Sequence, residues 1–501
     1  MADPVEIELK FQVLPAARAG VRRAVATRTA VVTRLQAVYA DTADDRLAGA
    51  AMALRLRKEG RIWVQTLKGR GDGLMQRLED EHPLPAQRGE PALDPTRHAG
   101  SMAGERLQAL LADGAELLPV YRTDVRRTHR QVRSGGALIE IAFDEGHISA
   151  GSRRLALSEI EFELLSGPPQ ALIALASRWV ERHGLWLDVR TKSERGHRLA
   201  RGLHTVPAVR AAAVPLSKGA STGAAFGTIA HAALLQILPN AAEVAGGSGL
   251  PEHLHQLRVG LRRLRSALRL FADWSGDADS ALALEQALRE PFNRLGEARD
   301  QDALAASLLP ALAAAGGPPL PPLPAAGVEP AAVLHERGFT LAILNALQMA
   351  TTAAQSPALA IPTQPTTRAE PPPKLREAAR RALQRSWRKA MTGADAFATL
   401  EIEAQHRTRK RLKRFRYGAE FVVDLFPGKA TAQTLSALRK ALDALGAYND
   451  ALVAADRFAA HVEADPRAWF AIGWLASQRE RLLKDAARSL RRLHRTPRFW
   501  R

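Results

Sequence analysis

Residues 5–13, VEIELKFQV, alternate apolar and polar side chains. Because successive side chains of a strand point to opposite faces, one face of this segment is apolar and the other carries Glu6, Glu8 and Lys10. The same period recurs up to about residue 200, in ALRLRK (53–58), RIWVQTLKG (61–69), MQRLEDE (75–81), ALIEIAFDEG (137–146) and LALSEIEFELL (155–165). The pattern predicts half-buried antiparallel strands, with helices at 168–184 and about 15–26.

The polar faces of these strands are almost entirely charged, and they mix both signs. Two arrangements satisfy this pattern. Either the charged face is exposed to solvent, or the sheet closes into a barrel whose charged face lines a wet lumen and whose apolar face packs outward against helices. Glu159, Glu161 and Glu163 repel one another unless a cation neutralises them. Carboxylates suit Mg²⁺ and Arg or Lys suits phosphate, but the spacing alone leaves both arrangements open.

The whole chain has 501 residues, no Cys and a formal net charge of +19. Without Cys it can form no disulfide framework, thiolate nucleophile, iron–sulfur cluster or Cys-ligated zinc site. It contains no apolar run near the roughly 18 residues that a membrane span needs, and its first residues lack the layout of a signal peptide. We therefore expect a cytoplasmic protein with no membrane partner.

A linker at 204–222 is predicted to divide the chain, because this segment is rich in Pro and small residues and has no hydrophobic period. It would separate a β domain at 1–203 from an all-α domain at 223–501. The net charge is +5 over residues 1–205 and +14 over residues 206–501. This excess predicts a polyanionic partner; the alternative is a general abundance of Arg on solvated helices.

The second domain is predicted to be helical wherever a hydrophobic period is clear. The expected helices are 223–238, 251–274, 278–315, 330–350, 373–391, 397–425, 431–464 and 467–494. Pro-rich loops of unknown role are expected at 313–330 and 356–373.

An internal repeat runs through this helical domain. HQLRVGLRRLRSALRLF (255–271) aligns with HRTRKRLKRFRYGAEFV (406–422), and LGEARD (295–300) aligns with LGAYND (445–450). The repeat predicts two copies of one helical unit, as duplicated bundles. Each copy has a row of cations at helical spacing beside an apolar seam: His255, Arg258, Arg262 and Arg265 in the first, and His406, Arg409, Lys413 and Arg416 in the second.

The cations within each row repel one another, and this repulsion must be offset. Like charges at this spacing cost about 0.2–0.5 kcal/mol per pair on an isolated helix. A polyanion bound in a groove between the rows would offset that cost, and cations extending into solvent are the alternative. Duplication of the same row favours the groove.

Residues 1–200 resemble the CYTH superfamily, the triphosphate tunnel metalloenzymes. Glu6-Ile-Glu8-Leu-Lys10 matches the ExExK signature of that family. The ordered matches continue in 39–44, 53–57, 66–68, 76–79, 139–144, 159–165 and 191–196. The resemblance implies a closed antiparallel β-barrel with a charged tunnel, and hydrolysis of a triphosphate that depends on Mg²⁺ or Mn²⁺.

The resemblance also implies roles for particular residues. Glu6, Glu8 and Lys10 would be catalytic. Triphosphate would be bound by Lys10, Arg55, Arg57, Lys68, Arg77, Arg127 and Lys192. The metal would be held by Glu6, Glu8, Asp144, Glu161 and Glu163, although the choice among Glu159, Glu161 and Glu163 is open. His129 stands where another basic residue is common in the family, so its role is open too.

Residues 220–501 resemble the CHAD domain, the conserved-histidine α-helical domain, through the H-x-x-R-V-x-x-R-R-L-R and LG-x-x-R-D elements. That family is all-α, with two four-helix bundles, and is associated with inorganic polyphosphate. The resemblance therefore implies that the two cation rows bind polyphosphate, and that the protein can associate with polyphosphate granules in the cytoplasm.

Two interpretations follow for the whole chain. The first is an inorganic triphosphatase that produces pyrophosphate and phosphate and holds polyphosphate in its helical domain. The second is a non-catalytic polyphosphate-binding or targeting protein; a related organic triphosphatase or an adenylate cyclase is a further alternative. Nucleic acid is an unlikely partner, because aromatic residues make up only 5% of the chain and no stacking platform is apparent.

Overall fold

The computed structural model describes residues 5–71, 75–85, 87, 89–320, 328–355 and 374–501. Its chain contacts form two compact units. The first comprises residues 1–209, 237–254 and 331–348, and the second comprises residues 210–236, 255–330 and 349–501. The predicted Pro-rich loop at 356–373 and part of the one at 313–330 lie outside the described residues.

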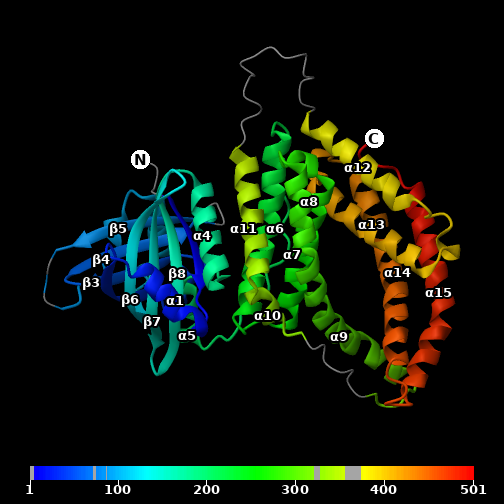
Figure 1. Cartoon of the computed structure of the whole chain (residues 1–501), viewed down its shortest axis with the longest axis horizontal. Helices are drawn as coiled ribbons and strands as arrows, with labels where there is room; N and C mark the ends of the chain where they lie inside the picture. Colours follow the sequence, from blue (N-terminus) through cyan, green and yellow to red (C-terminus); the bar gives the residue numbers. More distant parts are fainter. Residues whose placement is uncertain (1–4, 72–74, 86, 88, 321–327, 356–373) are drawn as a thin grey trace, which may run out of the picture. The chain divides into compact units, whose positions relative to one another are not determined.

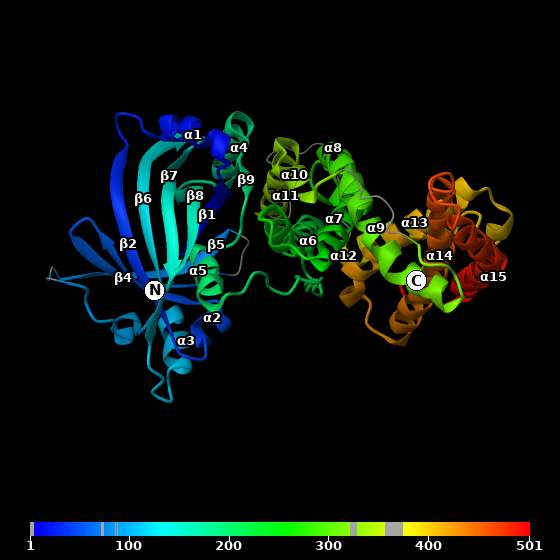
Figure 2. The same ribbon diagram turned by 90° about the horizontal axis from the view of Figure 1, so that it is seen from below.

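The first unit contains a closed barrel of antiparallel strands (Figures 1 and 2). The strands are β1 (Val5–Gln12), β2 (Val31–Asp41), β3 (Ala53–Glu59), β4 (Ile62–Arg70), β5 (Gln76–Leu84), β6 (Leu118–Ser134), β7 (Ala137–Ala150), β8 (Arg153–Ser166) and the short β9 (Trp186–Leu187). Their order is β5-β4-β3-β2-β6-β7-β8-β1-β9, and β1 also pairs with β5. That last pairing closes eight strands, so the predicted barrel is confirmed over the open, solvated sheet.

The apolar face of the barrel points outward and is covered by helices, as predicted. Helix α4 (Pro169–His183) packs on β1, β7 and β8, where Phe162 lies between Phe11 and Trp179 with ring centroids 5.7 Å from each. Helix α4 ends at Gly184, whose φ of 63° suits a residue without a Cβ. Helices α1 (Arg18–Val25) and α3 (Met102–Leu110) cover other strands, and α2 (Arg46–Gly49) is a short connection.

Two long strands were not fully recognised in the sequence: β2 was missed, and β6 was identified only around Arg127 and His129, which were placed on one strand face. β2 has an irregular burial pattern, and β6 carries a run of charged residues on both faces, so neither shows clean alternation. Both are paired along nearly their whole length, and their register comes from their neighbours.

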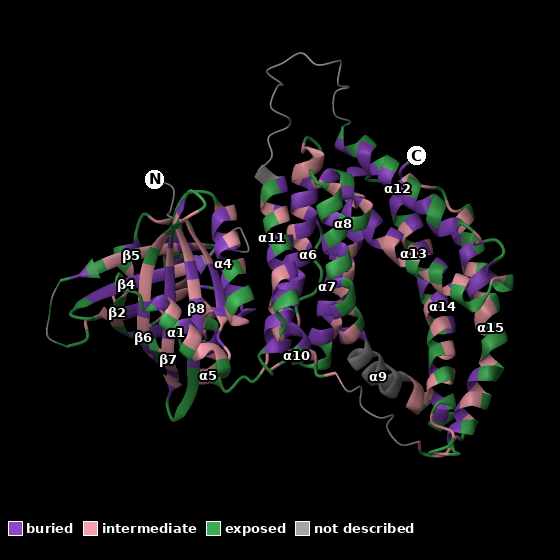
Figure 3. Ribbon diagram, in the orientation of Figure 1, coloured by how far each residue is buried: buried purple, intermediate pink, exposed green. Residues whose placement is uncertain are grey.

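Most of the described residues from 222 onward are helical, as expected, and a helix at 192–201 that was not expected precedes them (Figure 3). The helices are α5 (Lys192–Arg201), α6 (Thr222–Ala245), α7 (Pro251–Leu270), α8 (Ala278–Ala287), α9 (Arg289–Ala314), α10 (Pro330–His335), α11 (Arg337–Gln355), α12 (Leu375–Met391), α13 (Ile402–Phe421), α14 (Lys429–Ala459) and α15 (Ala468–Arg495).

Three helix predictions were wrong in detail. The single helix expected at 278–315 is two helices, α8 and α9, which separate at Leu288 so that Pro291 falls in the first turn of α9, where its missing N–H costs little. The single helix expected at 330–350 is likewise two, α10 and α11. Helix α6, expected to end at 238, continues through Pro239 to Ala245, because Ala241, Ala242 and Ala245 are buried.

The expectation that no apolar segment is long enough to span a membrane was wrong for helix α6. By length and composition it is long and apolar enough to cross a membrane. However, 56% of its most apolar window is buried inside the structure, as in the core helix of a globular unit.

Candidate active site

The strand register brings the charged side chains together inside the barrel. Glu8 on β1 lies opposite Glu163 on β8, and Glu163 lies opposite Glu140 on β7. One step along, Lys10 lies opposite Glu161. All seven predicted phosphate ligands lie on the lumen face of the barrel or, in the case of Lys192, on the helix that packs against it.

Within the lumen, Lys192 at the start of α5 occupies the centre of a carboxylate cluster. Its Nζ lies 2.8 Å from Asp144 Oδ2, 2.5 Å from Glu159 Oε1 and 2.7 Å from Glu161 Oε1. Those three carboxylates each bring an oxygen within 4.8 Å of the others, a spacing that could hold a metal ion. The ammonium therefore stands where a cation would be expected.

Arginines complete this cluster. Arg127 binds Asp144 with two hydrogen bonds of 2.8 and 2.7 Å and reaches Glu161 at 2.5 Å. Arg195, one turn after Lys192, pairs with the fully buried Glu159. Burial raises the pKa of Glu159, but Arg195 and Lys192 outweigh it and lower that pKa to about 2. The lowered pKa values of Glu159 and Glu161 show that cations of the chain itself hold these two carboxylates ionised.

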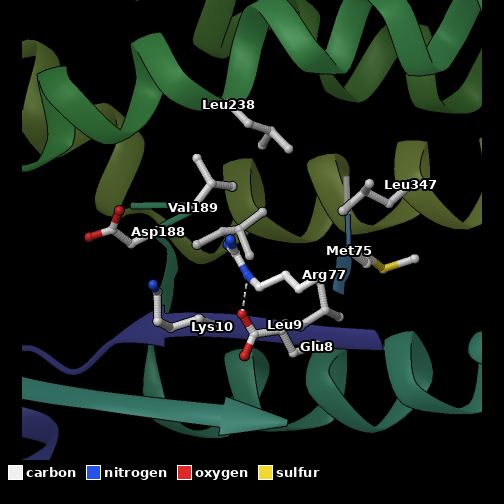
Figure 4. A pocket seen from close by; sticks show the side chains of 10 residues that line it. Glu8, Leu9, Lys10, Met75, Arg77, Asp188, Val189, Leu238 and Leu347 are labelled. Carbon is white, nitrogen blue, oxygen red and sulfur yellow. Dashed lines mark hydrogen bonds and ion pairs between the residues drawn. The ribbon is translucent and has the colours of Figure 1, made fainter. Parts of the chain in front are cut away.

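A second set of pairs joins β1 to β4 and β5. Lys68 Nζ lies 3.1 Å from Glu6 Oε2 and 2.8 Å from Glu79 Oε2. Arg77 Nε lies 2.5 Å from Glu8 Oε1, as Figure 4 shows. Glu8 and Arg77 line a pocket with Lys10 (Figure 4).

The acidic wall of the lumen has too few cations. Glu163 makes no hydrogen bond or ion pair with any described residue, yet it faces both Glu8 and Glu140. Burial, and then the charge of Glu140, raises the pKa of Glu163 to about 7. Burial also raises the pKa of Glu6 to about 9, against the opposing effect of Lys68. Adjacent carboxylates without enough counter-charge are the donor set that a hard divalent cation neutralises, so Mg²⁺ or Mn²⁺ fits this wall.

Arg55 is a buried cation that the protein leaves partly unsatisfied. Its side chain is 8% exposed, and its NH1 donates to Tyr39 Oη at 3.2 Å. Its Nε and NH2 have no hydrogen-bond partner among the described residues, since Glu79 and Glu81 stay 3.7 and 3.6 Å from NH2. A buried guanidinium in this state costs free energy that an anionic oxygen would recover.

Lys10 lies among both signs of charge. Its Nζ donates to the backbone carbonyl of Arg190, and burial lowers its pKa although Glu159 opposes that effect. His129 lies 3.2 Å from Glu140 and so belongs to the same lumen face.

Three lumen residues were not among the predicted ligands, namely Glu79, Glu81 and Arg195, and Glu159 was one of the three glutamates among which the choice of metal ligand was open. The alternation of β5 and β8 placed Glu79, Glu81 and Glu159 on the charged face, which was the available signal. No local pattern shows that Arg195 reaches into the barrel, because that depends on where α5 packs.

The cation rows of the helical domain lie on α7 and α13. The predicted seam of α7 is buried, with Leu257, Leu261 and Leu264 fully enclosed. The guanidinium groups of Arg258, Arg262 and Arg265 all lie 5.1–5.4 Å from the ring centroid of one aromatic side chain, Phe292.

Parts of each row are neutralised by neighbouring carboxylates. Arg265 lies 2.7 Å from the buried Glu285, and Arg416 lies 3.0 Å from Glu420. Arg409 lies 3.5 Å from Asp450, and His406 Nδ1 lies 2.7 Å from Asn449 Oδ1. The His/Arg and LG-x-x-N-D elements of the second copy therefore meet in space; the matching side chains at 297–300 lie outside the described residues.

Arg262 and Lys413 differ from the neutralised residues of their rows, because neither forms an ion pair with a described residue. Burial, followed by Arg409 and Arg262, lowers the pKa of Lys413 to about 7. The helices α7 and α13 approach each other, because the guanidinium of Arg263 lies 5.1 Å from the ring centroid of Phe421 and a Cβ on Gly418 would come within 2.4 Å of Leu270. This is the juxtaposition that a groove for a polyanion requires.

Comparisons with known proteins match two separate parts of the chain to two different domain families. The CYTH domain model matches residues 5–196, and the CHAD domain model matches residues 228–459. An inorganic triphosphatase from Haemophilus influenzae is 32% identical over 200 residues, which are 39% of this chain and 54% of that protein. The chain thus aligns with about half the length of that relative.

Two solved structures are also similar. The CHAD domain from the plant Ricinus communis is 28% identical and covers 58% of this chain and 99% of that chain, with a TM-score of 0.45. The PH1819 protein from Pyrococcus horikoshii OT3 is 19% identical and covers 38% of this chain and 97% of that chain, with a TM-score of 0.26.

Proposed function

Because this chain consists of a CYTH domain followed by a CHAD domain, we propose that it is a metal-dependent inorganic triphosphatase that also binds polyphosphate. The observation that carries the proposal is the buried Arg55, whose Nε and NH2 lack hydrogen-bond acceptors among the described residues, in a lumen that also contains the other six predicted phosphate ligands. Phosphate oxygens are the acceptors that such a set of guanidinium and ammonium groups fits.

The chain's own residues would bind and orient the substrate. Lys10, Arg55, Arg57, Lys68, Arg77, Arg127 and Lys192 would bind the phosphate oxygens. In phosphoryl transfer, positioning and charge neutralisation supply most of the rate enhancement. Water would attack a terminal phosphorus, the P–O–P bridge would break, and the products would be pyrophosphate and phosphate.

The predicted metal ligands are Glu6, Glu8, Asp144, Glu161 and Glu163. Glu6 and Glu8 each pair with one cation, Lys68 and Arg77, whereas Glu163 forms an ion pair with no described residue, and we favour this acidic wall as the position of Mg²⁺ or Mn²⁺. Asp144 and Glu161 are already neutralised by Lys192 and Arg127, so they would bind metal only after Lys192 turned toward substrate. A bound metal ion would neutralise phosphate oxygens and acidify a water molecule.

The test is phosphate release from triphosphate with Mg²⁺ or Mn²⁺. Glu6→Gln and Glu8→Gln should each lower kcat/KM about 100-fold or more, the scale typical of losing a group that stabilises the transition state. Glu145→Gln is the matched control, because Glu145 follows Asp144 on β7 but pairs with Arg22. Full activity in both site variants would reject the assigned site.

A panel of substrates distinguishes the inorganic triphosphatase from the second interpretation, a non-catalytic polyphosphate-binding protein. Triphosphate, ATP, thiamine triphosphate and long polyphosphate are compared for turnover and for binding. Turnover of triphosphate above the others supports the triphosphatase, and binding of long chains without any turnover supports the alternative. The cytoplasmic location and an association with polyphosphate granules remain predictions.

A further inference from the structure

One end of the barrel lumen is apolar. A buried cluster there consists of Leu35, Ala37, Tyr39, Tyr121, Val125, Ile148, Ala150 and Leu157. The register places these residues on the same face as the charged ones: Leu157 precedes Glu159 by two positions on β8, and Tyr39 is paired with Arg55. Along β6, β7 and β8 the lumen wall therefore changes from charged to apolar, whereas β3 keeps Glu59 and Arg57 opposite Leu35 and Ala37.

Helix α5 covers this apolar end. Leu199 and Ala200 pack against the cluster, while Lys192 and Arg195 on the same helix reach the carboxylates of the charged layer. A Cβ on Gly196 would come within 2.2 Å of the Tyr121 ring, so the helix approaches that ring as closely as a glycine allows.

Tyr39 and Tyr121 are the aromatic members of this apolar cluster. Their rings stack with centroids 4.7 Å apart and an interplanar angle of 17°, and they are only 5% and 7% exposed. The Tyr39 hydroxyl also accepts a hydrogen bond from Arg55 NH1 at 3.2 Å. Since the rings cover each other and Gly196 lies against Tyr121, they offer no free face on which a nucleobase or thiamine ring could stack.

We propose that the stacked pair Tyr39–Tyr121, held by Gly196 of α5, is the floor of the substrate tunnel and limits the length of phosphate chain that can bind productively. This inference rests on the proposed function. A phosphate chain carries charge along its whole length, and a desolvated phosphate finds no cation or hydrogen-bond donor among the aliphatic side chains of the cluster. A chain must then enter from the opposite end and stop with its terminal phosphate near Arg55.

Two consequences distinguish a closed tunnel from an open one. First, triphosphate should be preferred over tetraphosphate, because the additional phosphate group cannot pass the floor. Second, a long polyphosphate cannot be threaded through the barrel and cut internally. A chain esterified at both ends should therefore resist hydrolysis.

The test compares wild type, Tyr121→Ala and Tyr39→Phe, using triphosphate and tetraphosphate. Tyr121→Ala removes the floor and should reduce the preference for triphosphate in kcat/KM by about 10-fold or more, the scale at which a pocket distinguishes one extra group. Tyr39→Phe keeps the stacked rings and loses only the hydroxyl that positions Arg55. It should raise KM for both substrates by the same factor. An unchanged preference in a folded Tyr121→Ala protein would overturn the proposal.

Two further measurements cover the remaining outcomes. If Tyr121→Ala does not fold, the proposal is tested by incubating wild type with polyphosphate esterified at both ends. Resistance of this chain to hydrolysis supports the floor, and internal cleavage overturns it. If wild type releases no phosphate from triphosphate, the proposed function fails. The floor is then tested through the Kd ratio of tetraphosphate to triphosphate, which should fall in Tyr121→Ala and would overturn the proposal if unchanged.

Discussion

Lys192 donates to Asp144 across 2.8 Å, and this contact joins the first turn of α5 to the middle of β7. Asp144 is fully buried, and it also accepts two hydrogen bonds from Arg127. The ammonium thus does two things: it neutralises the carboxylates of the lumen and holds a helix over one end of the barrel.

Replacement of Lys192 by Gln should destabilise the protein by about 3–5 kcal/mol, because breaking a buried pair leaves carboxylates without a counter-charge. Urea denaturation measures the loss. Mg²⁺ should raise the midpoint of the variant more than that of wild type, since metal and ammonium compete for the same oxygens. Lys58→Gln, on β3 and beside Trp63, is the control. Equal midpoints for Lys192→Gln and wild type would contradict the role assigned to the contact.

Replacement of Arg55 by Gln should raise KM for triphosphate about 10- to 100-fold, because a hydrogen bond between charged groups contributes roughly 1.5–3 kcal/mol. Steady-state kinetics of phosphate release provide the measurement. Arg34→Gln is the matched control: Arg34 lies on the neighbouring strand β2, is exposed and pairs with Asp124. Similar KM values for Arg55→Gln and Arg34→Gln would show that Arg55 does not contact the substrate.

Polyphosphate binding by the helical domain should weaken as pH rises through about 7, because Lys413 loses its charge there. Titration calorimetry of the full chain from pH 6 to 8.5 should also show net proton uptake on binding near pH 7, since the polyanion restores the proton. Lys413→Gln should remove both effects, and Lys410→Gln, exposed on the same helix, should keep them. Binding that is independent of pH would exclude Lys413 from the groove.

The lowered pKa of Lys413 also affects the free energy of unfolding. Lys413 has a pKa of about 7 in the folded chain and about 10.5 in the unfolded chain, so the unfolded state binds more protons between those values. Its contribution to the free energy of unfolding should therefore increase from pH 7 to pH 10. The difference between wild type and Lys413→Gln in urea denaturation should change over this range. A constant difference would contradict the lowered pKa.

Asp80, His82 and His98 form a separate cluster on the barrel wall, and we expect it to be structural. His98 Nδ1 lies 2.9 Å from Asp80, and its Nε2 lies 3.1 Å from the Gln65 amide nitrogen. Two hydrogen bonds between Gln65 and the Asp94 backbone orient that amide as a donor. His98 therefore accepts at Nε2 and keeps its proton on Nδ1, where it cannot bind a metal.

Asp80→Ala should accordingly cost about 1–3 kcal/mol, because the buried His98 loses its acceptor. Asp113→Ala, which breaks an exposed pair with Arg46, should cost no more than about 1 kcal/mol. Thermal denaturation compares the two variants, and Zn²⁺ should not stabilise wild type. Stabilisation by Zn²⁺ that disappears in Asp80→Ala would instead identify a metal site.

Much of the barrel could be predicted because a strand has a strict period of two. Glu6, Glu8 and Lys10 had to share a face, and so did Arg55 and Arg57. The helices were harder to bound. Pro239 is a local signal for a helix end, yet the helix continues because the alanines that follow are buried against other parts of the fold.

The sequence by itself determined which side chains share a face and which helices repeat the same row of cations, because both follow from local periodicity. Only the tertiary structure decided which charges meet. Pairing of β1 with β5 turned a charged sheet surface into a lumen, and the position of α5 placed Lys192 among three carboxylates. Those contacts depend on closure and on packing between segments far apart in the chain, and no local pattern encodes either.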